Sequence, residues 1–257
     1  MQPLVLGRAS CDQATCPVRL KDVFKVSCDL IANLDVVRVT RVDNCGAPVP
    51  GENAFVSECV ASVAMNPNVD VADDVIYRAA NGNLCGVKRG CPTLLGYDLE
   101  FNFFQVSPQL TSVLTNQPEV LDPAGEPVGV DDCSIQCSGG FALEFWAELV
   151  GQNCTDTGAQ RYLYVLIPWV SNAYLSDLEI GSEAVTFQLV GNSTAGGRWG
   201  TGPYNVVNTT VAPAAPVPGK MLTPLGATCH RRMQITTIAP PVPDPLCDFA
   251  TVPPAAP

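Results

Sequence analysis

Residues 96–122 read GYDLEFNFFQVSPQLTSVLTNQPEVLD and predict one strand that runs into one short helix. In the first part, large apolar side chains alternate with acidic and amide side chains, which is typical of a strand with one buried and one solvent-facing side. Ser107 then provides an N-cap oxygen, and Pro108 stands at the first helical position, where its missing N–H costs nothing. Asn116 can adopt the left-handed turn that ends a helix, so we expect a helix over about 107–116.

The expected helix has one apolar stripe, formed by Leu110, Val113 and Leu114 at positions i, i+3 and i+4. We predict that this stripe packs on the apolar side of the sheet. Burial of each of these side chains would contribute on the order of 1.5–3 kcal/mol. The strand and the helix therefore form a packing unit, and the unit has no group arrangement typical of catalysis.

The composition favours a β-rich domain. The chain has 257 residues, of which 47% are hydrophobic and 15% are charged, and this length is enough for a sizeable core. Val, Thr, Phe and Tyr dominate the patterned stretches, while 21 Gly and 23 Pro separate them. We expect a mainly β fold, a β-sandwich or partly open barrel of two antiparallel sheets, with one short flanking α-helix.

The pattern along the chain predicts one β domain between two terminal segments. The expected parts are an N-terminal arm (1–22), a β domain (23–210) with loops near 43–53, 66–96 and 119–138, and a Pro-rich C-terminal segment (211–257) with a candidate strand at 233–238. Besides the strand that starts at Gly96, the clearest expected strands are 23–31, 34–42, 54–65, 139–150, 160–170 and 184–190.

The net charge of −11 argues against a protein that grips nucleic acid. Binding of phosphates needs clustered cations, and the longest run of basic residues here is Arg231–Arg232. Met1–Ser10 has no apolar stretch of signal-peptide length, and the longest apolar run, 162–170, is too short to span a bilayer. We expect a soluble chain that is made in a cytoplasm and has no membrane partner.

Acidic residues follow the strand alternation. Asp98 and Glu100 lie on one expected strand, and Glu144 and Glu148 lie on another, each opposite apolar neighbours. Paired carboxylates can serve as the acid and base of a glycosidase. The stronger interpretation is an acidic, solvent-facing sheet surface, because residues two or four apart on a strand point the same way.

Other candidate motifs carry little catalytic signal. His230 is the only histidine, it lies in a stretch without clear periodicity, and no G-x-S-x-G nucleophile turn is present. The glycines of 196–204 do not match a phosphate loop, which needs G-x4-G-K-[ST] before a helix, so they favour a structural turn. We therefore predict no enzymatic activity, no cofactor and no metal site.

The cysteines leave two redox states open. The chain has 12 Cys, and their spacings are not the C-x2-C pairs of zinc sites. Mostly reduced cysteines are favoured. The candidate disulfide pairs are Cys85 with Cys91 and Cys133 with Cys137, on the condition that the mature particle experiences oxidising surroundings.

Several segments in order resemble the major tail (tail tube) proteins of long-tailed bacteriophages, especially those of actinobacteria. The run 96–122 is similar to their strand–helix element, although Ser-Pro-Gln-Leu replaces the usual Asp-Pro-Glu-Leu helix start. The other similar segments are GFALEFWAELVGQNC (140–154), YLYVLIPWVSNAYLSDLEI (162–180), AVTFQLVGNSTAGGRWGTGPYNVV (184–207) and ITTIAPPVPDP (235–245).

The resemblance covers roughly residues 35–245 and implies a structural protein of the virion tail, of the sheathless, siphovirus type. Members form hexameric rings that stack into a tube, and one sheet of each subunit joins its neighbours in an inner β-barrel. Genomic DNA passes through the lumen without specific binding. The implied partners are other copies of the chain and the tape measure, tail terminator and distal tail proteins.

Together these arguments predict that Asp98, Glu100, Glu144 and Glu148 line the lumen, where their negative potential would repel DNA within about 8 Å. The loop 119–138 and the terminal segments are expected to contact stacked rings.

The alternative from another class is a secreted, disulfide-bonded β-rich binding protein, glycosylated at the N-x-[ST] sites Asn153, Asn192 and Asn208. A hydrolase with paired carboxylates and another virion protein, a capsid decoration or tail terminator subunit, remain further alternatives.

Overall fold

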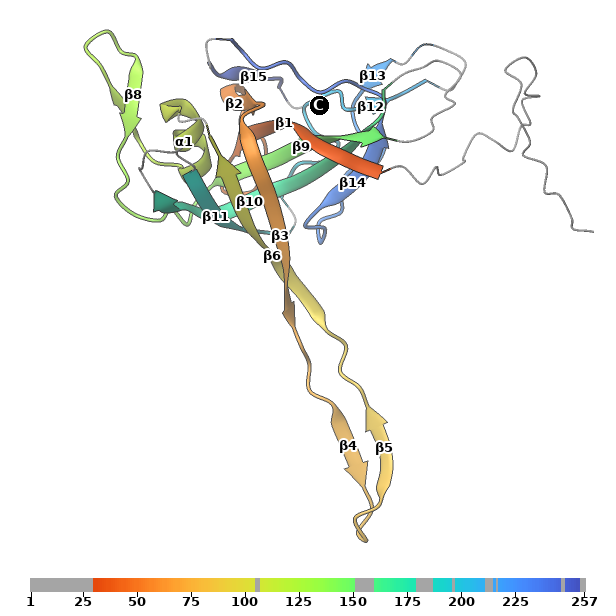
Figure 1. Cartoon of the computed structure of the whole chain (residues 1–257). Coiled ribbons are helices and arrows are strands. Elements are labelled where there is room, and N and C mark those ends of the chain that lie inside the picture. The colour runs from red at the N-terminus through yellow and green to blue at the C-terminus, as the bar shows by residue number, and fades with distance from the viewer. Residues whose placement is uncertain are drawn as a thin grey trace, which may run out of the picture.

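The computed structural model of the chain describes residues 30–104, 107–150, 160–178, 187–195, 197–210, 215, 217–245 and 248–254. The expected N-terminal arm (1–22), most of the expected strand 23–31 and the sequon at Asn153 lie outside these residues. The described part is mainly β, with antiparallel sheets and one short helix, as the sequence predicts (Figure 1).

The main sheet has nine strands in the described part of the chain. Eight of the strands follow the order β15-β2-β1-β9-β10-β11-β6-β3, and the ninth, β14, pairs with β10. The strands are β1 (Leu30–Val42), β2 (Gly51–Ser57), β3 (Val60–Asp70), β6 (Thr93–Phe103), β9 (Gly140–Val150), β10 (Tyr162–Leu178), β11 (Phe187–Ser193), β14 (Arg232–Thr236) and β15 (Ala250–Val252).

Three two-stranded ribbons accompany this sheet among the described residues. They are β4 (Val75–Arg78) with β5 (Leu84–Lys88), β7 (Glu119–Leu121) with β8 (Pro127–Val130), and β12 (Val207–Asn208) with β13 (Pro218–Gly219).

The long strand β10 has two partners in tandem along one edge. Its first part pairs with β14, and its second part, from Val170, pairs with β11. Its opposite edge pairs with β9, with a register shift between Ile167 and Val170. Close approach at this shift requires Gly140, because a Cβ at that position would lie 2.1 Å from the carbonyl oxygen of Val170.

Helix α1 (Pro108–Thr115) has the predicted caps. The Ser107 hydroxyl accepts a hydrogen bond from the Leu110 N–H, and Asn116 ends the helix in the left-handed region with φ 55°. The predicted stripe is confirmed, since Leu110, Val113 and Leu114 are buried in the main core with β1, β6, β9 and β10.

The sheet has buried clusters on both sides. The side that α1 covers holds the main core, which includes Phe55, Leu99, Phe141 and Ile167. On the opposite side, the segment after β11 covers the middle of the sheet, where Trp199 and Met221 pack against the side chains of β1, β9 and β10. This second layer buries β9 on both sides.

Three predicted boundaries are corrected. The expected strand 54–65 is two strands, β2 and β3, because the chain turns at exposed Glu58. The expected loop 119–138 contains the ribbon β7–β8, and the expected extended tail contributes β15, which pairs with β2. The candidate strand 233–238 is present as β14, two residues shorter at its C-terminal end.

Candidate assembly surface

A long β-hairpin projects from the body of the protein. β3 and β6 pair from Val60 opposite Phe103 to Asp70 opposite Thr93, and the ribbon β4–β5 continues beyond them (Figure 1). We call residues 66–96 of this hairpin the arm. Neither buried cluster of the described residues includes a residue of the arm, so the arm lies outside the packed core of the body.

The arm exposes large apolar side chains along its length. Nine of them are between 40% and 75% exposed: Val69, Val71, Val75, Ile76, Tyr77, Leu84, Val87, Leu94 and Leu95. Apolar groups concentrated on one projecting element are typical of a protein–protein contact. An isolated two-stranded ribbon is also marginally stable in water, so we expect the arm to be stabilised by another chain.

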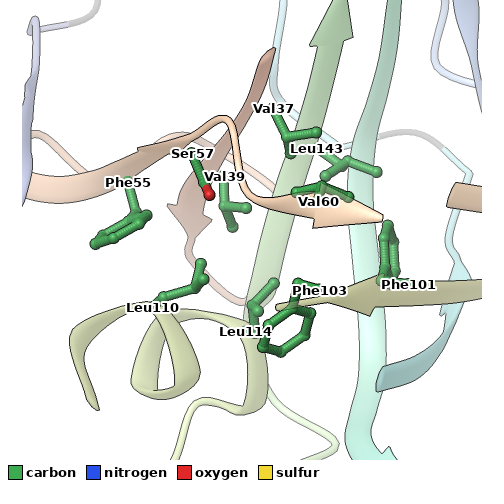
Figure 2. A pocket seen from close by; sticks show the side chains of 10 residues that line it. All are labelled: Val37, Val39, Phe55, Ser57, Val60, Phe101, Phe103, Leu110, Leu114 and Leu143. Atoms are coloured by element: carbon green, nitrogen blue, oxygen red, sulfur yellow. The ribbon is translucent and has the colours of Figure 1, made fainter. Parts of the chain in front are cut away.

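The base of the arm is anchored in the main core. Phe101 and Phe103 of β6 and Val60 of β3 point toward α1 and β1, and Figure 2 shows them around a cavity of about 20 Å³. Ten residues line this cavity: Val37, Val39, Phe55, Ser57, Val60, Phe101, Phe103, Leu110, Leu114 and Leu143. The cavity wall is almost wholly apolar. It offers no set of polar groups for a ligand, and its residues hold the arm at a fixed place on the body.

The alternation predicted for the strand at 97–103 is confirmed. Leu99, Phe101 and Phe103 are buried, whereas Asp98 is exposed and Glu100 is half-buried. The cross-strand neighbours of these acids on β3 and β11 are uncharged: Asn66, Ala64, Val190 and Asn192. The Asn192 side-chain amide donates a hydrogen bond of 2.8 Å to the Asp98 carboxylate. This part of the sheet therefore presents a polar, negatively charged surface, which we call the acidic face.

The prediction that Glu144 lies on such a surface is wrong. Its side chain is 1% exposed and receives two hydrogen bonds of 2.7 Å from the Arg38 guanidinium, in bidentate geometry. The Tyr164 hydroxyl donates a third, of 2.6 Å. Burial results from the second layer described above, which covers this half of the sheet. Glu148 lies nearer the strand end and is half-buried, so of the four acids only Asp98 is fully solvent-facing.

The surroundings of Arg38 complete a buried polar cluster. Its guanidinium carbon lies 3.4 Å from the ring centre of Tyr204 and 5.2 Å from that of Trp146, which are cation–π contacts. Burial alone would lower the pKa of Arg38, but the Glu144 carboxylate outweighs it and raises that pKa, so the arginine stays charged. Burial, reinforced by Glu144, raises the pKa of Tyr164 well above its usual range. Burial also raises the pKa of Tyr204 to about 12.

His230 is buried, and its contacts are typical of a structural residue. Its Nδ1 lies 3.1 Å from the Ser193 hydroxyl, which accepts a hydrogen bond from the Tyr97 N–H, and its ring meets Tyr97 edge-on. Serine and histidine in contact invite comparison with a nucleophile and base, but both side chains are buried and no carboxylate of the described residues bonds to the histidine. The contact connects the end of β11 to the start of β14.

The glycine-rich turn borders a surface pocket of about 220 Å³. Residues 199–203 line it together with Arg198, Lys220 and the neighbouring Pro48. The turn also buries Trp199, whose ring packs beside Tyr204. Sequence reasoning identified the turn but gave no indication of the pocket.

The candidate disulfide pairs are not bonded. Cys85, Cys91, Cys133 and Cys137 are free and exposed, as are the other cysteines with described surroundings. The described residues contain no cluster of three or more His, Cys, Asp or Glu side chains able to hold a metal ion. None of the described helices is long and apolar enough to cross a membrane.

Comparison with known proteins adds no relative. No protein-family model matches the chain, and no curated protein is significantly similar to it.

Proposed function

We propose that this chain is a structural subunit of a long, sheathless bacteriophage tail, where it forms hexameric rings that stack into the tail tube. The observation that carries the proposal is the arm, a projecting β-hairpin with nine exposed apolar side chains. In a monomer these apolar side chains stay in contact with water, which is unfavourable. A subunit that inserts the hairpin between neighbouring copies removes the same side chains from water.

The position of the arm in the sheet supports ring closure. β3 is a terminal strand of the main sheet, so its outer edge carries free backbone donors and acceptors. A second copy that adds its sheet at this edge would satisfy them by strand addition. Repeated around a ring, such pairing gives the inner barrel that the sequence resemblance implies.

The acidic face supports a role as a conduit for DNA. It lies on β6 and carries Asp98 and Glu100 without a neighbouring cation across the strands. If β3 and β6 of each copy line the lumen, this face meets the passing DNA and repels its phosphates. Glu144 takes no part in this, because it is buried and paired with Arg38.

The proposal includes no catalytic role. The buried cluster around Arg38 and Glu144 is closed to substrates and serves stability, and the Ser193–His230 contact has no orienting acid. The alternative of a secreted, disulfide-bonded binding protein receives no support from the free, exposed cysteines at 85, 91, 133 and 137. Mass spectrometry of native material, for glycans and for free thiols, separates the two functions.

The deciding experiment is negative-stain electron microscopy of the concentrated full-length protein, with hollow tubes as the expected result. The comparison protein is a hairpin deletion, which lacks residues 71–92 and joins Asp70 to Thr93 by an Asn-Gly turn. These two residues are cross-strand partners, so the turn closes the hairpin in register. We expect this variant to fold, by circular dichroism, and to remain monomeric.

Matched point variants test the apolar contact itself. Leu84→Asn changes a leucine on the arm that is 59% exposed, and Leu222→Asn changes one on the body that is 76% exposed. Tube formation should fall for the first variant and persist for the second. A full-length protein that stays monomeric at every concentration, or a hairpin deletion that forms normal tubes, would refute the proposal.

A further inference from the structure

The far end of the arm is positively charged, in contrast to the rest of the protein. Residues 75–91, which we call the arm tip, contain Arg78, Lys88 and Arg89 and no acidic residue, whereas the whole chain has a net charge of −11. Asp73 and Asp74 come directly before this segment, and the Asp74 carboxylate accepts a hydrogen bond of 2.9 Å from the Gly90 N–H. Lys88 and Arg89 are exposed and have no ion-pair or hydrogen-bond partner among the described residues. The arm tip thus joins exposed apolar side chains to three positive charges.

A second projection has the opposite charge. Residues 119–132, which we call the acidic hairpin, form the ribbon β7–β8 and its flanks and contain no Lys or Arg. Their five acids are Glu119, Asp122, Glu126, Asp131 and Asp132. Among the described residues, only the Asp122 carboxylate of these five has a hydrogen-bond partner, since it accepts two N–H bonds of the hairpin turn.

The acidic hairpin also exposes apolar side chains. Leu121 is 56% exposed, Val128 is 60% exposed and Ile135, which follows the hairpin, is 52% exposed. The two projections therefore match in both respects that favour binding. Each offers apolar area, and each offers unpaired charges of a sign that the other lacks.

The two projections cannot meet within one chain. In Figure 1 the acidic hairpin extends from the α1 side of the body, and the arm tip lies at the far end of the arm, in the opposite direction. A contact between them must join two molecules. Because the two surfaces are different, the contact is heterologous, and such a contact gives either a closed ring or an open stack. The two surfaces extend in opposite directions from the body, which favours the stack.

We propose that the arm tip of one copy docks on the acidic hairpin of the next copy along the tube. This inference depends on the proposed function and names the partner of the arm. Valine, isoleucine and leucine side chains of the two ribbons pack in the centre, and Lys88 and Arg89 face the carboxylates at the edge. The charges also set polarity: two arm tips repel each other, as do two acidic hairpins, so rings stack only head to tail.

Charge reversal tests the pairing. The tip variant carries Lys88→Glu and Arg89→Glu, and the hairpin variant carries Glu126→Lys, Asp131→Lys and Asp132→Lys. We expect each variant alone to raise the protein concentration needed for tubes on the order of tenfold, measured by sedimentation and electron microscopy. A chain with all five changes restores opposite charges on the two surfaces and should recover most of the loss.

The matched control is Arg198→Glu with Lys220→Glu, which reverses two cations on the body at the pocket beside the glycine-rich turn. It has the same overall charge as the tip variant and should leave tube formation unchanged. Equal losses in the tip variant and this control would overturn the inference, because net charge alone would then explain both.

Native cysteines allow a test without substitutions. Cys85 and Cys91 lie on the arm tip, and Cys133 and Cys137 follow the acidic hairpin, all free and exposed. A short bis-maleimide applied to assembled wild-type protein should link a tip cysteine of one copy to Cys133 or Cys137 of another, as read by peptide mass spectrometry. Wild-type tubes that lack this link and tolerate charge reversal overturn this inference alone. A wild-type chain that forms no tubes overturns both it and the proposed function.

Discussion

Replacement of Glu144 by Gln should destabilise the folded chain far more than its conservative chemistry suggests. The substitution keeps the side-chain shape but removes the charge that faces the Arg38 guanidinium across two bonds of 2.7 Å. The Arg38 side chain is 8% exposed and the Glu144 side chain is 1% exposed, so water cannot take the place of the carboxylate. The arginine then stays buried as an uncompensated cation.

Removal of one partner of a buried ion pair costs about 3–5 kcal/mol. The ring of Tyr204 at 3.4 Å still faces the guanidinium, and a desolvated cation–π contact contributes about 2 kcal/mol. We therefore expect a loss in the lower half of that range, about 3–4 kcal/mol in the free energy of unfolding. A typical domain has only about 5–15 kcal/mol in total.

The assay is urea unfolding at a protein concentration where light scattering detects only monomer. Tryptophan fluorescence gives the signal, and Trp146 reports directly on the cluster because its ring lies 5.2 Å from Arg38. The control is Glu148→Gln on the same strand, where the acid is half-buried and the cost should stay below about 0.5 kcal/mol.

A double variant, Arg38→Met with Glu144→Leu, separates an unpaired charge from lost packing. It removes both charges and should lie within about 1.5 kcal/mol of the wild type, or above it. If Glu144→Gln costs less than about 1 kcal/mol in the free energy of unfolding, solvent reaches the ion pair in solution, and burial of the pair is refuted.

Three other outcomes follow from the fold. The pKa of Tyr204, raised by burial to about 12, means that the folded state holds this proton more tightly than the unfolded state, so stability is complete below pH 10 and falls as the pH rises from 10 through 12. Between pH 9 and pH 11.5 the free energy of unfolding in urea should fall less for Tyr204→Phe than for the wild type. Equal decreases in the two proteins would contradict a raised pKa of Tyr204. Ser107→Ala removes the helix N-cap and should cost about 1 kcal/mol in the same assay at neutral pH, with no cost if the cap bond is absent in solution. Gly140→Ala places a Cβ 2.1 Å from the Val170 carbonyl oxygen and should yield insoluble or unfolded protein, whereas a soluble variant with a wild-type melting temperature would exclude the close β9–β10 approach.

The helix and the strand before it could be predicted because their signals are local. Ser107, Pro108 and Asn116 fix the helix ends within one residue, and the alternation at 97–103 follows from a strand with one buried side. Burial of Glu144 could not be predicted in this way, because it depends on chain segments far away in the sequence. A signal was nevertheless present, since Arg38 and Glu144 are the charged members of the otherwise apolar stretches 36–39 and 141–147. They lie directly opposite each other on β1 and β9.

The arm was the part least visible in the sequence. Residues 66–96 were expected to be a loop, because a ribbon exposed on both sides shows neither strand alternation nor a continuous apolar run. The ribbon at 119–130 was hidden for the same reason, although Asp122 and Gly125 mark its turn.

The pairing of β15 with β2 has a consequence for the order of events in the cell. It joins residues 250–252 to residues 51–54, so the other described strands of the main sheet are synthesised before β15 can cover the edge of β2. Such long-range closure is slow compared with formation of α1 or of the hairpin at 60–103. We expect the hairpin to form early on the ribosome, while the edge of β2 stays uncovered until residues 250–252 have emerged. Chains that have not yet reached residue 250 therefore leave the outer edge of β2 unpaired, and that edge can pair with other strands until β15 covers it.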